Sequence, residues 1–87
     1  MKQLVQVKEV EGEGLVGLMG QRVTLMCGVY FYTGELIGVN DTFVKLKDAS
    51  VVFETGPFTT KTWQDAQKLP NDWYVQTSSI ESFGILK

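Results

Sequence analysis

The feature of the sequence that most constrains its fold is a long central stretch in which apolar and polar side chains alternate. Alternation with a period of two is typical of β-strands that bury one face. Val23, Leu25 and Cys27 share one such face at the start of the stretch. Gly34 and Gly38 lie inside the run that follows, where glycine marks a bulge or a sharp bend. The pattern therefore predicts a strongly bent strand.

Turn signals divide the chain into about five short strands. Asn40-Asp41-Thr42 separates the second predicted strand from the third, and Gly56-Pro57 interrupts the third. The last two predicted strands, Trp73–Thr77 and Ile80–Leu86, are joined by a tight turn at Ser78-Ser79. Short antiparallel strands of this kind favour a small barrel.

Three segments outside these strands have weaker signals. Gly14–Gly20 has apolar residues at helical spacing, but its three glycines limit a helix to one or two turns. Lys61–Leu69 has a composition compatible with a helix and equally with a structured loop. Leu4–Val7 alternates and is compatible with a short strand.

The length and composition predict one globular domain that spans residues 1–87. Hydrophobic residues make up 44% of the chain, which is too many for a disordered segment and requires a packed core. Residues 1–13 are interpreted as an N-terminal extension, and residues 54–72 as a long loop insertion. No apolar run approaches the roughly 20 residues of a membrane span, so we expect no membrane partner.

Charge and cysteine content limit the partners and the compartment. Eight basic against ten acidic side chains give a net charge of −2, unlike proteins that grip duplex DNA through many phosphates. Cys27 is the only cysteine, so an intramolecular disulfide is impossible and a reducing compartment fits. We therefore expect a cytoplasmic protein that contacts any bound nucleic acid through a local part of its surface.

The residue types give little support to catalysis, and we expect no catalytic residue, no metal and no cofactor. The sequence has no histidine, so the commonest general base and the commonest zinc ligand are absent. Cys27 lies in an apolar strand and is interpreted as a buried core thiol. The aspartates are scattered over turns without the spacing of a calcium loop: Asp41, Asp48, Asp65 and Asp72.

One motif of nucleotide-binding proteins is present in an unsuitable context. Gly12–Gly17 matches G-x-G-x-x-G, and Glu35 lies about where a ribose-binding acid is found in such proteins. A dinucleotide fold needs a long helix after these glycines and a parallel sheet, whereas the following strands look antiparallel. We interpret the glycines as a flexible approach to the short helix.

Several stretches follow the order of known motifs. Val23-Thr24-Leu25, Tyr32–Asn40 and Asp48-Ala49 match one motif, and Val75–Phe83 matches the spacing of a second. From Leu15 to Phe83 the chain thus resembles the Sm/LSm family, including its bacterial Hfq branch. The resemblance implies an all-β fold, a small, strongly bent, five-stranded antiparallel Sm-like (SH3-type) barrel with a short N-terminal helix.

The resemblance also implies a binding position in the second motif. In that family, single-stranded RNA threads the inner rim of a ring, and an Arg-Gly pair of this motif helps to clamp a base. Here Gln76 stands at the arginine position and Thr77 at the glycine position. The change removes a charge but keeps an amide that can pair with base edges, so we expect weaker binding.

The loop of the first motif can be aligned in two registers. Counted from Gly34, Asn40 takes the place of the motif's aspartate and Val44 that of its base-contacting asparagine. Counted from Asp41, the run to Val44 resembles the Hfq loop and places Phe43 at the stacking position. We prefer the second register, and the alternative is that Phe43 belongs to the core. The candidate RNA-binding residues are Asn40, Asp41, Phe43, Lys45, Gln76 and Thr77.

Together these features predict a non-catalytic homo-oligomeric ring of about five to seven subunits. Its expected partner is single-stranded RNA, with DNA as the alternative, in RNA processing or turnover. Lys45 and Lys47 are the expected phosphate contacts. A first rival hypothesis keeps the ring as a protein-interaction scaffold that has lost nucleic-acid binding, and a second is a nucleotide-binding or enzymatic protein.

Overall fold

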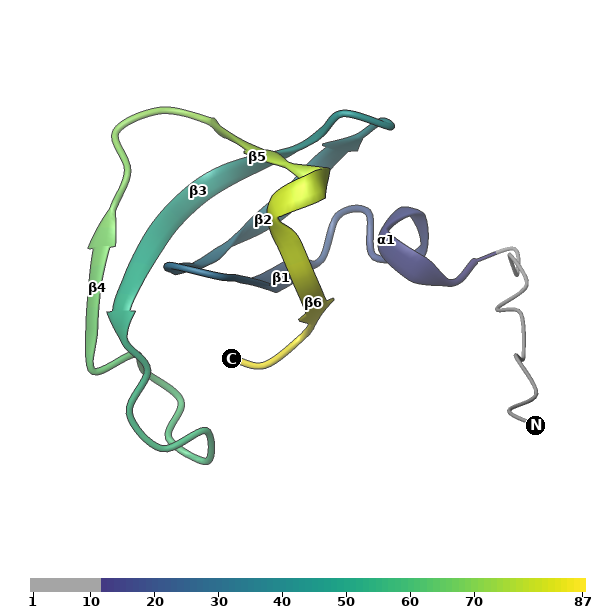
Figure 1. Ribbon diagram of the computed structural model, residues 1–87. Helices are drawn as coiled ribbons and strands as arrows, with labels where there is room; N and C mark the ends of the chain where they lie inside the picture. The colour runs from purple at the N-terminus through teal and green to yellow at the C-terminus, as the bar shows by residue number, and fades with distance from the viewer. Residues whose placement is uncertain (1–11) are drawn as a thin grey trace, which may run out of the picture.

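The described chain forms one antiparallel β-sheet preceded by a single turn of α-helix (Figure 1). The structure is a computed structural model that describes residues 12–87, so the predicted strand at Leu4–Val7 lies outside the described residues. Within 12–87, no helix has the length and apolar character needed to cross a membrane. The elements in chain order are α1 (Gly14–Gly17), β1 (Arg22–Cys27), β2 (Phe31–Val39), β3 (Phe43–Glu54), β4 (Asp65–Lys68), β5 (Trp73–Gln76), the 3₁₀ turn η1 (Thr77–Ser79) and β6 (Ile80–Gly84).

The long strand β3 organises the sheet because it pairs with three partners. One edge of β3 pairs with β2, while β5 pairs with its first residues and β4 with its last. Beyond β2 the order continues through β1 to β6. The six strands form an open sheet, since β5 and β6 follow each other through η1 but are not paired with each other. A mostly β, antiparallel fold is therefore confirmed.

The sheet bends at the glycines that the sequence singled out. The pairing of β2 with β3 changes register between Thr33 and Glu35 and again between Leu36 and Gly38. At Gly34 the two strands approach so closely that a Cβ atom would lie 3.0 Å from the Cβ atom of Leu46. The predicted bend is therefore confirmed, and Figure 1 shows β3 curving along its whole length.

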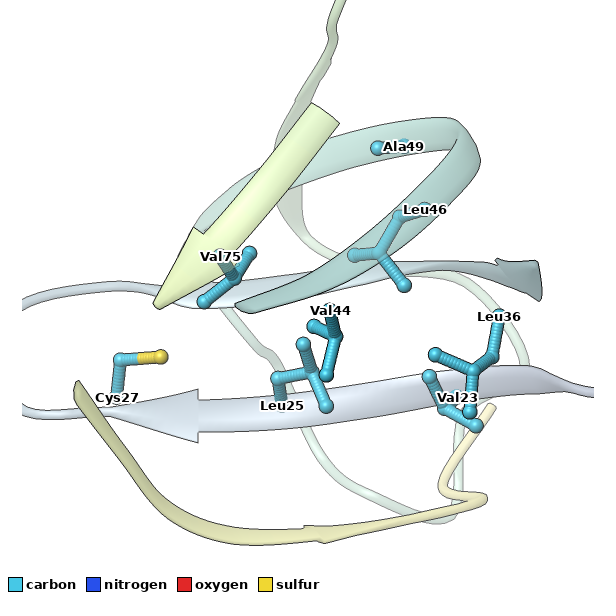
Figure 2. Close-up of a cluster of buried hydrophobic side chains, with 8 residues drawn as sticks. All are labelled: Val23, Leu25, Cys27, Leu36, Val44, Leu46, Ala49 and Val75. Carbon is cyan, nitrogen blue, oxygen red and sulfur yellow. The ribbon is translucent and has the colours of Figure 1, made fainter. Parts of the chain in front are cut away.

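The hydrophobic core lies inside this bend. In Figure 2 the side chains of β1 point toward those of β3 and β5 across the interior. Leu25, Leu36 and Leu46 have no exposed surface, and each contributes about 1.5–3 kcal/mol of burial free energy. The predicted inward face of β1 is confirmed. The buried cluster comprises Val23, Leu25, Cys27, Leu36, Val44, Leu46, Ala49 and Val75.

The interval from residue 54 to residue 72 differs from its prediction. It contains the short strand β4 where a helix or a structured loop was expected at Lys61–Leu69. All four residues of β4 are exposed, so no apolar pattern in the sequence marks this strand. It forms because the end of β3 offers unpaired backbone groups, which β4 satisfies from Asp65 to Lys68.

Lys87 anchors the loop between β3 and β4. The Nζ atom of Lys87 donates hydrogen bonds to the carbonyl oxygens of Thr55, Pro57 and Thr62, at 2.8, 3.0 and 3.0 Å. The same atom lies 4.6 Å from the centre of the Trp63 ring, within the range of a cation–π interaction. The C-terminal residues therefore fix the loop against the sheet.

Candidate nucleic-acid interface

The two segments predicted to bind RNA are adjacent in the structure. β3 begins at Phe43 and β5 ends at Gln76, and these two residues are direct partners in the antiparallel pairing of the strands. They lie far apart in sequence, so only the fold brings them together. Directly opposed residues of an antiparallel pair have Cβ atoms roughly 4.5–5.5 Å apart. The phenyl ring and the amide can therefore act on one ligand.

Two of the residues predicted to bind RNA, Asn40 and Thr77, form hydrogen bonds with the backbone of the β2–β3 turn. The Oδ1 atom of Asn40 accepts hydrogen bonds from the backbone N–H groups of Thr42 and Phe43, at 2.8 and 2.9 Å. The hydroxyl of Thr77 donates to the carbonyl oxygens of Asp41 and Thr42, at 2.8 and 3.1 Å. Asn40 and Thr77 thus shape the turn between β2 and β3 and fasten it to the end of β5.

The ring of Phe43 forms part of an exposed aromatic pair. It meets Tyr74 edge to face, with 5.1 Å between the ring centres. Phe43 is 36% exposed and Tyr74 is 54% exposed. Val44, the next residue along β3, is fully buried. The alternation along β3 therefore directs Phe43 away from the buried cluster, and the ring has surface available for stacking.

Lys45 extends this aromatic pair along β3. It is paired with Tyr74 in the sheet, and its ammonium group lies 5.5 Å from the centre of that ring. The same group forms an ion pair with Asp72 at 3.8 Å. Both side chains are partly exposed, so this ion pair is worth at most about 1 kcal/mol. A phosphate group can therefore compete with Asp72 for Lys45.

An aromatic hollow of about 530 Å³ opens beside the pair. It lies between the β1–β2 turn, β5 and the start of β6, and it has the size of a small-ligand site. Its polar groups include the amide of Gln76 and the carboxylate of Glu81, which forms no salt bridge within residues 12–87. Its aromatic wall consists of Tyr30, Tyr32, Trp73 and Tyr74.

A second hollow, the lysine hollow, has a volume of about 570 Å³ and shares Tyr74 with the aromatic hollow. It is formed by β3, the end of β4 and the segment between β4 and β5. Tyr74 contributes to the lining of both hollows. The charged groups of the lysine hollow are Lys45, Lys47, Lys68, Asp48 and Asp72.

The thiol of Cys27 also borders the aromatic hollow, in a protonated state at neutral pH. Burial, with a smaller contribution from the carboxylate of Glu81, raises the pKa of this thiol above its ordinary value of 9.0. A raised pKa lowers the fraction of the nucleophilic thiolate. Among residues 12–87, no group of three or more metal-ligating side chains lies close enough to hold an ion.

Sequence reasoning pointed to one strip of this candidate interface and did not point to the rest. Phe43, Gln76 and Lys45 were found from the motif or from the charge pattern. Tyr74 was missed because no motif contains it, although alternation along β5 puts it on the same face as Gln76. Glu81 joins the site only through the turn η1 that follows β5, a placement that the linear sequence does not reveal.

Comparison of the sequence with protein-family models and with curated proteins finds no match.

Proposed function

We propose that this protein is a non-catalytic Sm-like subunit that binds single-stranded nucleic acid, with RNA as the preferred ligand. The direct pairing of Phe43 with Gln76 carries the proposal, because it joins the two motif segments at one exposed position. The ring of Phe43 stacks on a base, and the amide of Gln76 hydrogen-bonds the edge of that base. Lys45 neutralises a neighbouring phosphate.

Assembly into a ring completes this proposed function. β5 and β6 each have one strand partner within residues 12–87, so each offers an edge with unpaired backbone groups. In a ring, β5 of one subunit pairs with β6 of the next, so both edges are satisfied and the bent sheets, which correspond to the barrel implied by the Sm resemblance, join around the ring. Repetition of a weak base site around about five to seven subunits raises the affinity for a long strand. We place this function in the cytoplasm, where the single unpaired thiol of Cys27 stays reduced.

Titration of labelled oligonucleotides tests the proposed site. Uridine-rich and adenine-rich RNAs are added to the wild type and to Phe43→Ala and Gln76→Ala at two salt concentrations. Loss of a stacking ring costs about 1–3 kcal/mol per base, so Phe43→Ala is expected to weaken binding at least about fivefold. Phe58→Ala removes an exposed ring from the β3–β4 loop and is the matched control. Equal binding by all four proteins, or none, would refute the site.

The scaffold hypothesis remains the alternative, and exposed apolar side chains on β6 favour it. Phe83 is 43% exposed, and Ile85 directly after the strand is 60% exposed. Such side chains suit a protein interface whether or not nucleic acid is bound. An oligomer that binds neither RNA in the titration above, and binds no DNA of the same sequences, supports this alternative.

A further inference from the structure

Tyr74 separates two hollows with opposite chemical character. The aromatic hollow offers flat apolar walls, and the lysine hollow offers cationic groups. Tyr74 lines both hollows and is 54% exposed, so a ligand can contact both hollows at once. A nucleotide has the matching construction, because a sugar joins its planar base to a phosphate group.

The charges of the two hollows decide which hollow takes the base of a nucleotide and which takes its phosphate group. Glu81 gives the aromatic hollow a negative charge, which repels a phosphate. The lysine hollow contains three lysines and two aspartates, so it has a net positive charge. Its Lys68–Asp48 pair spans 3.7 Å between exposed side chains and is weak enough for an anion to compete. The phosphate therefore belongs in the lysine hollow and the base in the aromatic hollow.

We propose that Tyr74 is the centre of a nucleotide site, with the base in the aromatic hollow and the phosphate in the lysine hollow. The site serves either a free nucleotide or one nucleotide of a bound strand, and only the second case rests on the proposed function above. Glu81 is an acceptor, and guanine presents two neighbouring N–H donors that one carboxylate can accept together. Guanine is therefore favoured over uracil.

Isothermal titration calorimetry on the full chain tests this site. The ligands are GMP, guanosine, UMP, inorganic phosphate and a ten-nucleotide RNA of alternating guanosine and adenosine. GMP is expected to bind more tightly than guanosine, UMP or phosphate. Tyr74→Leu should weaken GMP binding at least about tenfold through lost stacking. The double variant Lys47→Gln, Lys68→Gln should weaken GMP about fivefold and leave guanosine unchanged.

Two control substitutions and the double lysine variant keep the test independent of folding. Phe58→Leu and Lys61→Gln alter an exposed ring and a lysine of the β3–β4 loop, outside both hollows, and should leave all affinities unchanged. If Tyr74→Leu loses the circular dichroism of the wild type, the double lysine variant decides. The site is wrong if the double lysine variant binds both GMP and the RNA as tightly as the wild type does. It is also wrong if the wild type binds neither GMP nor the RNA.

The same titrations separate the two sources of the nucleotide. Binding of GMP that equals binding of the RNA identifies a free nucleotide, and it contradicts the strand-binding function while supporting this site. Tighter binding of the RNA, with the same loss in the Tyr74 and lysine variants, identifies a nucleotide within a strand. RNA binding that falls in Phe43→Ala but not in the Tyr74 and lysine variants refutes this site and leaves the proposed function standing.

Discussion

Thr24 and Thr33 place two hydroxyl groups in the interior without hydrogen-bond partners. The residues are opposite each other on β1 and β2 and are 2% and 1% exposed. Neither Oγ1 atom has a partner within the described residues. An unsatisfied buried polar group costs about 1–3 kcal/mol. Thr24→Val and Thr33→Val keep the branched shape and remove this cost, so each should raise the free energy of unfolding by about 1 kcal/mol in urea titrations.

Thr77→Val is the matched control for these two substitutions. Its hydroxyl donates to the carbonyl oxygens of Asp41 and Thr42, so the same change removes hydrogen bonds that exist. We expect the free energy of unfolding to fall by about 1 kcal/mol. A similar loss in Thr24→Val and Thr33→Val would show that their hydroxyls are paired in solution.

Cys27 gives the stability a dependence on alkaline pH. Burial, with a smaller contribution from Glu81, raises the pKa of its thiol above 9.0. The native state therefore binds the thiol proton more tightly than the unfolded chain does. It follows that the free energy of unfolding falls as the pH rises from the unfolded pKa through the higher native pKa.

Urea titrations of the wild type and Cys27→Ala from about pH 7 to about pH 10 measure this effect. The two proteins differ only at residue 27, so the difference between their two curves isolates the thiol. The difference should be constant up to about pH 8 and then decrease. A constant difference over the whole range contradicts the raised pKa.

The residues of the site differ in how far the sequence could predict them. Phe43 and Gln76 were identified because a motif resemblance links two distant segments, and the strand pairing brings them together. The side-chain oxygen of Asn40 accepts hydrogen bonds from backbone N–H groups, a role that follows from the local turn chemistry of asparagine. Tyr74 and Glu81 depend on which strands become neighbours, which short-range patterns do not encode.

At the scale of elements, the sequence predicted the strands whose own pattern specifies them. β1 has a complete apolar face, formed by Val23, Leu25 and Cys27, and was found with nearly its observed bounds. β4 has the sequence Asp-Ala-Gln-Lys, with four exposed side chains and weak strand preference. Its conformation comes from its partner β3, so it could not be predicted before the edge of β3 was known.

The contacts of Lys87 with the β3–β4 loop can be tested by substitution. Lys87→Met removes three hydrogen bonds to backbone carbonyls and a cation–π contact while keeping the length of the side chain. We expect the loop to open, with a loss of about 1–2 kcal/mol in the free energy of unfolding. Limited trypsin digestion should cut after Lys61, in that loop, several-fold faster than in the wild type.

Lys47→Met is the control for Lys87→Met because it removes an exposed lysine that does not contact this loop. Its cleavage rate after Lys61 should equal that of the wild type. Equal rates in Lys87→Met and the wild type would mean that the loop is held by other contacts.

At the scale of the whole molecule, the sheet has strand edges that must be covered in some way. β5 runs beside β3 alone and β6 beside β1 alone within the described chain. Exposed edges of this kind promote association, and in a closed ring β5 of one copy can pair with β6 of the next, which covers both of these edges. Among the described residues, β4 pairs only with β3 and keeps a free edge in such a ring. The apolar side chains of Phe83 and Ile85 lie on or next to β6, where a neighbouring copy would bury them.

Charge substitution at these two residues tests the proposed ring and its link to nucleic-acid binding. A buried lysine without a partner costs several kcal/mol, so the double variant Phe83→Lys, Ile85→Lys should dissociate the ring into single chains. Light scattering measures the mass, and Phe58→Lys, in the β3–β4 loop, should keep the mass of the wild type. A single chain loses the benefit of repeated sites, so its affinity for a long RNA should fall about 100-fold or more. Its affinity for a trinucleotide should stay unchanged, because Phe43 and Gln76 belong to one subunit. A wild type that remains a single chain at every concentration would remove the ring from the proposed function.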